Sequence, residues 1–144
     1  NPGLEIHQDD AAETKYRFSQ LDQKQLEEMV EKTLGFFETS DAYLNPNFQM
    51  NGLAKAVQIP RHQMSQVLNL GMGMSFYEIL NHYRVEEVIR RFGLEELKDQ
   101  SILDIAFSVG FNSKSTFNAA FKRQTGKTPS QYRESLQGGG KSLE

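Results

Sequence analysis

The sequence predicts an all-α fold, with two helix-turn-helix subdomains joined by a long linker helix. Three observations lead to this fold class. Apolar residues recur at helical spacing along most of the chain, two pairs of short helices each meet across a short turn, and the two pairs share an internal layout. With 38% hydrophobic residues, among them 10 Phe and 5 Tyr, the chain has enough apolar surface for a core.

The first helix is predicted from Asp22 onwards. Its apolar residues fall at i, i+3, i+4, i+8 and i+11 and form a single stripe, namely Leu26, Met29, Val30, Leu34 and Phe37. We expect the turn-forming residues Asn45-Pro46-Asn47 to end this helix.

The first pair of short helices is predicted over residues 50–57 and 61–69. Their inward-facing residues are Leu53, Ala54 and Val57 on the first helix, and Met64, Val67 and Leu68 on the second. Gln58-Ile59-Pro60 lies between the helices, and Pro60 suits the first turn of a new helix although it cannot continue an old one.

A long amphipathic helix is predicted over residues 75–92. Gly71-Met72-Gly73-Met74 breaks the chain before it, and Ser75 with Glu78 three residues later forms a capping box. Its apolar positions are Phe76, Ile79, Leu80, Tyr83, Val88 and Phe92. At 1.5 Å per residue, roughly 18 residues span about 27 Å.

The last third repeats the scheme of the first pair. Ser101, with Asp104 at the third position, begins a helix, Gly110-Phe111-Asn112 turns the chain, and the next helix covers residues 113–124. The inward-facing residues are Ile102, Ile105, Ala106, Val109, Phe117, Ala120 and Phe121. Gly126 ends this helix, and Thr128-Pro129 opens a short final one.

The two pairs of helices form an internal repeat. Each copy places Ala on the inner face three residues before Val, as Ala54 before Val57 and Ala106 before Val109, and a small residue there lets two helices cross closely. With the two valines as anchors the copies lie 52 residues apart. This match favours a bilobed domain over a bundle in which helix pairs arise by chance.

We divide the chain into five segments. Residues 1–20 are a lead-in or linker that we expect to be flexible, 21–74 hold the lead-in helix and the first helix-turn-helix, 75–98 the connecting helix, 99–136 the second helix-turn-helix, and 137–144 a flexible tail. The terminal Leu143-Glu144 looks like a cloning scar. We therefore expect a fragment of a longer protein, without its N-terminal sensor region.

Positive charge gathers toward the C-terminus, although the net charge is −3. Residues 1–60 hold 10 acidic and 5 basic residues, residues 61–100 hold 6 and 5, and residues 101–144 hold 3 and 6. A face that binds phosphate groups needs such a local excess of cations.

Nothing in the sequence indicates an enzyme, a metal site or a cofactor. There is no cysteine, and His7, His62 and His82 lack metal-ligand spacing. No phosphate-binding loop or nucleophile motif is present. Without a long apolar run or a signal peptide, this part of the protein is expected in the cytoplasm, while a longer protein would be free to carry a membrane anchor.

Three motifs follow one another in the last third of the chain: I-A-x-x-x-G-F over residues 105–111, S-x-x-x-F-x-x-x-F-K over 113–122 and G-x-T-P-x-x-Y-R over 126–133. Together they resemble the second helix-turn-helix of AraC/XylS-type transcription regulators. The resemblance extends upstream through Tyr83-Arg84-Val85 to about Phe48 and covers more than half of the chain. The helix from Asp22 is similar to the one that precedes the domain in some sensor-fused members.

The resemblance implies a homeodomain-like fold of about seven helices, acting as the sequence-specific DNA-binding domain of a bacterial transcription regulator. Two recognition helices would enter successive major-groove segments of one duplex, about one DNA turn or 34 Å apart. The implied partner is double-stranded promoter or operator DNA. RNA polymerase, and a second copy of the protein joined through the sensor region, are further candidate partners.

The outward faces of the two recognition helices carry the candidate DNA contacts. On the first helix these are Arg61, His62, Ser65 and Gln66; on the second they are Ser113, Lys114, Ser115, Thr116 and Asn118, followed by Lys122, Arg123, Lys127 and Thr128. We expect Lys114 and Asn118 at base edges, Gln66 at adenine, and Arg61 at guanine or a phosphate. His62 suits a solvated surface position equally well. Backbone N–H groups of residues 128–131 can bind a phosphate.

The chain departs from the family at Ala119, where many members carry Arg, and its first recognition helix has Arg61 as its one firmly charged base. We therefore expect the second unit to anchor DNA and the first to refine the binding. Arg84 is expected to have a structural role, as the ion-pair partner of Glu87 or another carboxylate. The alternative function is a helical protein-interaction module with degenerate DNA binding, which the acidic first half favours.

Overall fold

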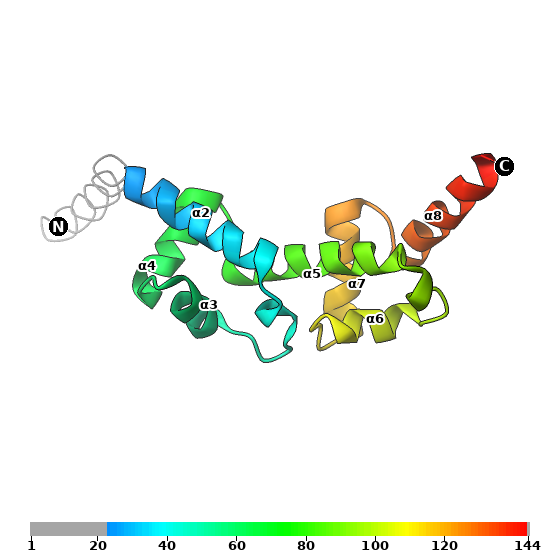
Figure 1. Ribbon diagram of the computed structural model, residues 1–144, viewed down its shortest axis with the longest axis horizontal. Helices are drawn as coiled ribbons and strands as arrows, with labels where there is room; N and C mark the ends of the chain where they lie inside the picture. The colour runs from blue at the N-terminus through cyan, green and yellow to red at the C-terminus, as the bar shows by residue number, and fades with distance from the viewer. Residues whose placement is uncertain (1–22, 144) are drawn as a thin grey trace, which may run out of the picture. The chain divides into compact units, whose positions relative to one another are not determined.

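The computed structural model describes residues 23–143 and has seven α-helices in that range (Figure 1). They are α2 (Gln23–Thr39), α3 (Met50–Val57), α4 (Arg61–Gln66), α5 (Phe76–Phe92), α6 (Ile102–Ser108), α7 (Lys114–Thr125) and α8 (Pro129–Leu143). Between them lie the 3₁₀ helices η1 (Ala42–Leu44) and η3 (Glu95–Leu97) and the π-helix η2 (Val67–Met72). The predicted all-α fold class is confirmed, while the predicted lead-in over residues 1–20 lies outside the described residues.

The chain forms two compact units. The described part of unit 1 covers residues 23–38 and 50–75, and that of unit 2 covers residues 39–49 and 76–143. Each unit therefore holds one helix-turn-helix, α3–α4 in unit 1 and α6–α7 in unit 2. The linker helix α5 belongs to unit 2, where α6 and α7 pack against it.

The first helix-turn-helix matches the predicted pattern of burial. All six predicted inward residues are buried, namely Leu53, Ala54, Val57, Met64, Val67 and Leu68. The predicted end of the second helix at residue 69 is wrong, because the chain continues from α4 into η2 and stops at Gly73, a left-handed residue with φ of 65°. The break therefore falls at the second glycine of the predicted pair, and Gly71 lies inside the helical segment.

The helix α2 ends earlier than predicted, at Thr39 and not at residues 45–47. The chain turns there because the Ser40 hydroxyl accepts a hydrogen bond from the Ala42 N–H at 3.1 Å, at the start of η1. Within the predicted stripe, Leu26 and Phe37 are buried. The sequence pattern missed Thr33, a fully buried polar residue whose hydroxyl donates to the Met29 carbonyl at 2.8 Å.

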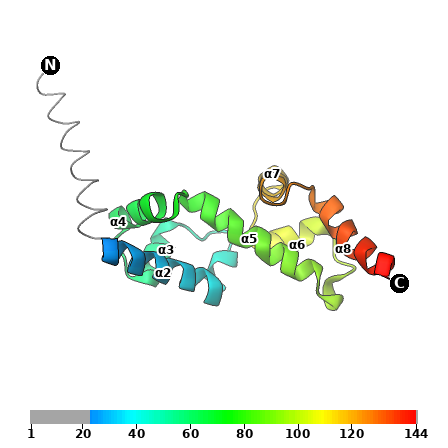
Figure 2. The ribbon, with the colours of Figure 1, turned by 90° about the horizontal axis from the view of Figure 1, so that it is seen from above.

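The core of unit 2 lies where α5, α6 and α7 meet. Its buried residues are Val85, Val88, Phe92, Ile105, Ala106, Val109, Phe111, Phe117 and Phe121. The rings of Phe111 and Phe117 meet edge to face, with centroids 5.2 Å apart, and Phe117 meets Phe121 at 5.7 Å. Figure 2 views α7 end-on, with α6 and α8 beside it. This aromatic cluster fixes the inner face of α7 and thereby determines which side chains point outward.

The final helix α8 is longer than the short helix predicted after Pro129, because it continues to Leu143. It therefore includes residues 138–140, three glycines that the sequence placed in a flexible tail. Glycine costs a helix about 1 kcal/mol per residue without preventing helical dihedral angles, and no proline follows Pro129.

The internal repeat is visible in the backbone of the two turns. Ile59 N–H bonds the Ala54 carbonyl at 3.0 Å, and Phe111 N–H bonds the Ala106 carbonyl at 3.2 Å, which is the same hydrogen bond 52 residues later. This six-to-one bond defines a Schellman turn, which needs a left-handed residue just before the donor. Gly110 (φ 108°) takes that place in unit 2 and Gln58 (φ 59°) takes it in unit 1.

Arg84 has a structural role, as predicted, but the proposed ion pair with Glu87 is wrong. The buried guanidinium donates to the carbonyls of Tyr43 (3.0 Å) and Asn45 (2.9 Å). Glu87 binds Arg90 and Arg91 on its own helix instead. Burial lowers the pKa of Arg84 from its ordinary value. Arg84 thus holds residues 39–49 on unit 2.

Candidate nucleic-acid interface

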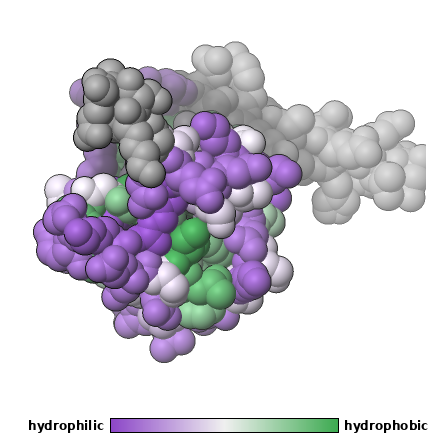
Figure 3. Space-filling view, turned by 90° about the vertical axis from the view of Figure 1, so that its right-hand side faces the viewer, coloured by the Kyte–Doolittle hydropathy of each residue, from purple (hydrophilic) through white to green (hydrophobic). Residues whose placement is uncertain are grey.

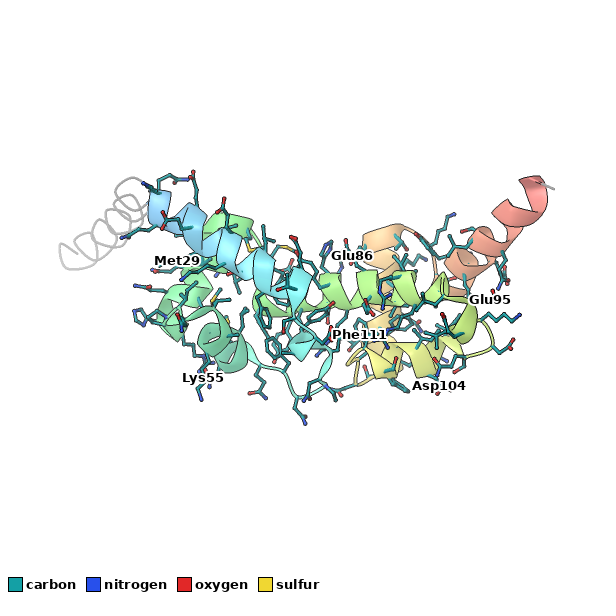
Figure 4. All side chains as sticks on the ribbon, viewed as in Figure 1. Met29, Lys55, Glu86, Glu95, Asp104 and Phe111 are labelled. Atoms are coloured by element: carbon teal, nitrogen blue, oxygen red, sulfur yellow. The ribbon has the colours of Figure 1, made fainter. Side chains whose placement is uncertain are left out.

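The helix α4 presents a polar face opposite its buried one. Arg61, His62 and Ser65 are exposed and Gln66 is half-buried, while Met64 on the other face is fully buried. The exposed Asn69 of η2 lies one turn beyond Ser65. The structure therefore brings the four candidate contacts of unit 1 onto one short helix. On α3, Lys55 points to solvent (Figure 4) and adds a positive charge to unit 1, although it was not among the predicted contacts.

The helix α7 presents the corresponding face in unit 2. Lys114, Ser115, Lys122 and Arg123 are exposed, and Asn118 is half-buried. Lys114, Asn118 and Lys122 follow one another at intervals of four residues and therefore lie on one side of the helix. Ala119 is exposed on the same helix, so it contributes little more than a methyl group to the surface.

A groove of about 520 Å³ runs beside this side of α7. Its lining comes from α6, α7 and the start of α8, and comprises Ile102, Leu103, Lys114, Asn118, Lys122, Thr128, Pro129 and Ser130. These lining residues include two lysines and no acidic residue, so an anionic ligand meets attraction without a repelling carboxylate among them. The groove brings together four of the predicted side-chain contacts, together with Ser130, which was predicted only as a backbone donor.

Two of the predicted contacts of α7 hold the start of the helix. The Ser113 hydroxyl accepts a hydrogen bond from the Thr116 N–H at 3.1 Å and donates to the Thr116 hydroxyl at 2.9 Å. Ser113 is therefore the N-cap of α7. Both hydroxyls are engaged within the helix, which directs Lys114 and Ser115 outward from a fixed first turn.

Thr128 has the same kind of role at the start of α8. Its hydroxyl accepts from the Gln131 N–H at 3.1 Å, and the Gln131 side chain accepts from the Thr128 N–H at 3.0 Å, which completes a capping box. Pro129 has no N–H. The capping box uses the N–H groups of Thr128 and Gln131. Among the donors predicted over residues 128–131, the Ser130 N–H is therefore the one that can bind a phosphate.

The G-x-T-P-x-x-Y-R motif positions α8 against the core. The Tyr132 ring lies edge to face with Phe121 at 5.5 Å. Arg133 donates to the carbonyls of Leu97 (3.0 Å) and Gln100 (2.7 Å), and its guanidinium lies 5.1 Å from the Phe92 ring. Tyr132 and Arg133 therefore have a structural role, and they fix the position of α8, which lines one side of the groove.

Glu87 of α5 is paired with two arginines on its own helix. Glu87 accepts from Arg90 at 2.7 Å and from Arg91 at 2.8 Å, and Arg91 also donates to the Ser108 hydroxyl of α6 at 2.8 Å. The hydrogen bond from Arg90 is the largest influence and lowers the pKa of Glu87, burial raises it, and the hydrogen bond from Arg91 lowers it further, so the pKa stays below its usual value. This cluster ties α6 to α5.

The face in Figure 3 is mostly hydrophilic, with a hydrophobic area near its centre. In residues 23–143 no group of three His, Cys, Asp or Glu residues is placed to hold a metal ion, and no helix in that range is long and apolar enough to cross a membrane. The outward faces of α4 and α7 remain the candidate interface.

Two helix-turn-helix units, each with a polar outward face on its second helix, are the arrangement expected of a DNA-binding protein. A family model described as "Helix-turn-helix domain" matches residues 53–135, more than half of the chain. The chain belongs to this AraC-type family, whose members are DNA-binding domains of bacterial transcription regulators and not enzymes.

Curated relatives agree with this assignment. The HTH-type transcriptional regulator MtrA of Neisseria gonorrhoeae is 32% identical over 87 residues, which are 60% of this chain and 28% of that protein. The probable transcription factor PqrA of Proteus vulgaris is 30% identical over 108 residues, 75% of this chain and 85% of that protein. The chain thus spans less than a third of MtrA and most of PqrA.

Solved structures show the same fold. The DNA-binding domain of AdpA, described as a global transcriptional factor in complex with a target DNA, has a TM-score of 0.60 at 22% identity, over 76% of this chain and 93% of that one. A Listeria innocua protein of unknown function has a TM-score of 0.59 at 25% identity, over 73% and 94%. These likenesses confirm the predicted seven-helix architecture.

Proposed function

We propose that the chain binds double-stranded DNA sequence-specifically, by placing α4 and α7 in successive major-groove segments of one duplex. One observation carries the proposal: each of these helices buries one face in its own unit and exposes a face of polar side chains that match base edges. A DNA partner of this kind would locate the domain in the bacterial cytoplasm.

The proposal gives each candidate residue one of three roles. Base edges are contacted by Arg61, His62, Ser65 and Gln66 from α4 and by Lys114, Ser115 and Asn118 from α7. Phosphates are contacted by Lys122, Arg123 and Lys127. Ser113, Thr116 and Thr128 act indirectly, because their hydroxyl groups cap α7 and α8.

The groove beside α7 suits a sugar-phosphate backbone. Lys122 can neutralise a phosphate there. Ser130 lies at the N-terminus of the 15-residue helix α8, where its N–H group and the positive end of the helix dipole both favour an anion. Lys114 and Asn118 border the same groove, so one DNA strand held in it would bring its bases toward them.

The two units are proposed to contribute unequally. Unit 2 supplies the lysines and the arginine of α7, and unit 1 supplies Arg61 with the neutral side chains of α4. Separate alanine scans of α4 and α7 test this division. Larger losses from α7 support it, and equal losses from both helices contradict it.

Selection of bound duplexes from a random pool, followed by titration at several salt concentrations, tests the function. A protein that neutralises several phosphates loses affinity linearly in log salt, and removing one contact lowers that slope by about 1. We expect this change for Lys122→Ala and a loss of sequence preference for Lys114→Ala. Lys98→Ala is the matched control, since Lys98 pairs with Glu95 away from the groove.

The alternative function, a helical protein-interaction module, makes the opposite prediction. A chain that binds no duplex even at low salt would contradict DNA recognition, and so would duplex binding that Lys114→Ala leaves unchanged. Contacts with RNA polymerase and with a second copy of the protein are further parts of the proposal. In vitro transcription with the selected site tests the first, and sedimentation of a full-length protein tests the second.

A further inference from the structure

Gly71 is the point at which η2 touches α2 within unit 1. A Cβ atom built on Gly71 would lie 2.5 Å from Val30 Cγ2 and 3.3 Å from Leu26 Cδ1, both on α2. Real Cβ atoms do not approach other atoms to 2.5 Å. Glycine is therefore the residue that lets α2 pack this closely on η2.

The segment that α2 contacts is the direct continuation of the recognition helix. Val67 ends α4 and begins η2 with ordinary helical dihedral angles, φ −58° and ψ −47°. Val67 and Leu68 of η2 are buried together with Met64 of α4. Because the two segments share one backbone and one core, a movement of η2 also moves the outward face of α4. π-Helical turns are rare and often occur at functional sites.

In the contact between α2 and Gly71, the side chain from α2 is rigid, and a groove lies beside the contact. Val30 is β-branched, so its χ1 angle in a helix is nearly fixed and its methyl group cannot rotate away from an added atom. A groove of about 410 Å³ borders the contact and is lined by Gln23, Leu26, Glu27, Val30, Glu31, Leu70 and Gly71. The contact between α2 and Gly71 therefore borders open space along this edge.

We propose that Gly71 is a positioning residue for DNA recognition, and that its contact with Val30 and Leu26 lets α2 set the orientation of α4. Displacement of α2 then changes what unit 1 contributes to sequence preference, while unit 2 keeps its own. The inference rests on the proposed function, in which α4 enters the major groove.

Gly71→Ala in the full 144-residue chain tests the inference, with base-pair changes in the selected duplex as the readout. A mismatched base pair costs a specific DNA-binding protein about 5- to 150-fold in affinity. We expect the wild type to show such losses in both major-groove segments. Gly71→Ala should keep these losses in the major-groove segment that α7 contacts. In the segment that α4 contacts it should reduce them to less than about threefold, which is below the range of specific recognition.

A compensating change and a control make the test decisive. Val30→Ala removes the atom nearest to the added Cβ, so the double variant Gly71→Ala with Val30→Ala should regain the losses in the segment of α4. Gly35→Ala lies on the same helix α2, and its added Cβ meets nothing within 4 Å, so it should bind like the wild type. A merely structural role for Gly71 would lower the melting temperature without this segment-specific change.

The outcomes separate the inference from the proposed function. A wild type without base-pair preference in the segment of α4 overturns the proposed function and the inference with it. A wild type with both preferences and a Gly71→Ala variant that keeps both overturns the inference alone. If Gly71→Ala unfolds, the double variant decides, because a folded double variant without preference in the segment of α4 also overturns it.

Discussion

The guanidinium group of Arg84 occupies the space beside Gly110 that a side chain at that position would need. A Cβ atom built on Gly110 would lie 2.7 Å from Arg84 Nε and 2.8 Å from the Leu44 carbonyl oxygen. Three parts of unit 2 meet here, namely α5, the segment over residues 39–49 and the turn between α6 and α7. Phe111, labelled in Figure 4, closes the site, with its ring centroid 6.0 Å from Arg84 Cζ.

Gly110→Ala should destabilise the protein by about 3 kcal/mol, because it adds a steric clash to a left-handed backbone conformation. Urea unfolding followed by circular dichroism measures the change. Gly126→Ala is the matched control: Gly126 has φ of 79°, but its added Cβ meets nothing within 4 Å. That variant should lose about 1 kcal/mol from the backbone conformation alone. Equal losses would show that the contact with Arg84 has no cost.

Arg84→Met should cost about 2–4 kcal/mol, since the carbonyls of Tyr43 and Asn45 lose a buried donor. Arg90→Met on the same helix is the control, because Arg90 is exposed and surface ion pairs contribute about 0–1 kcal/mol. Thermal unfolding of both variants provides the comparison. An Arg84→Met variant as stable as the control would mean that these carbonyls find other donors.

Gln58→Gly should stabilise unit 1 by about 1 kcal/mol, because Gln58 adopts the left-handed conformation that glycine adopts without strain. Denaturant midpoints measure the gain. Gln58→Ala removes the same side chain but keeps the backbone strain, so it should give no gain. If Ala stabilises as much as Gly, the side chain and not the backbone is responsible.

Glu87→Gln should destabilise the protein at neutral pH and have little effect in acid. The pKa of Glu87 is lowered in the folded state from an ordinary value of 4.5, so its contribution is present above pH 4.5 and is lost as the pH falls through the folded-state pKa. We expect a difference of about 1–2 kcal/mol at neutral pH that shrinks at a pH well below 4.5. Urea titrations at the two pH values measure it, with the exposed Glu96→Gln as a control that should show no such difference. A difference that persists in acid would contradict this account.

Local signals in the sequence predicted much of the fold. Apolar spacing gave the burial of both recognition helices, and α3 has the predicted bounds of Met50 and Val57. The predicted Ser101 cap is confirmed by its hydrogen bond from the Asp104 N–H at 3.0 Å. Gly126 ends α7 as predicted. These features depend on neighbours within one or two helical turns, which a single sequence displays.

Long-range contacts were not predictable in this way. The partners of Arg84 lie 39 and 41 residues away in the sequence, and both are backbone carbonyls. The predicted ion pair with Glu87 was wrong because charge alone does not indicate such partners. At the candidate interface, periodicity gave the correct outward faces. It did not separate Ser113 and Thr128, which cap helices, from residues available to DNA, because a hydroxyl group suits both roles. The individual DNA contacts stay predictions.

The sequence spacing between the two helix-turn-helix copies changes within the turn that joins their two helices. This change limits how residues can be exchanged between α4 and α7. The copies are 52 residues apart up to Ile59 and Phe111, but Pro60 corresponds to Ser113, since Met64 N–H bonds Pro60 as Phe117 N–H bonds Ser113. The second turn is thus one residue longer. A chimera that grafts the proposed DNA contacts of α7 onto α4 must align the two helices with a spacing of 53 residues. With a spacing of 52, every grafted side chain would be rotated by about 100° around the helix.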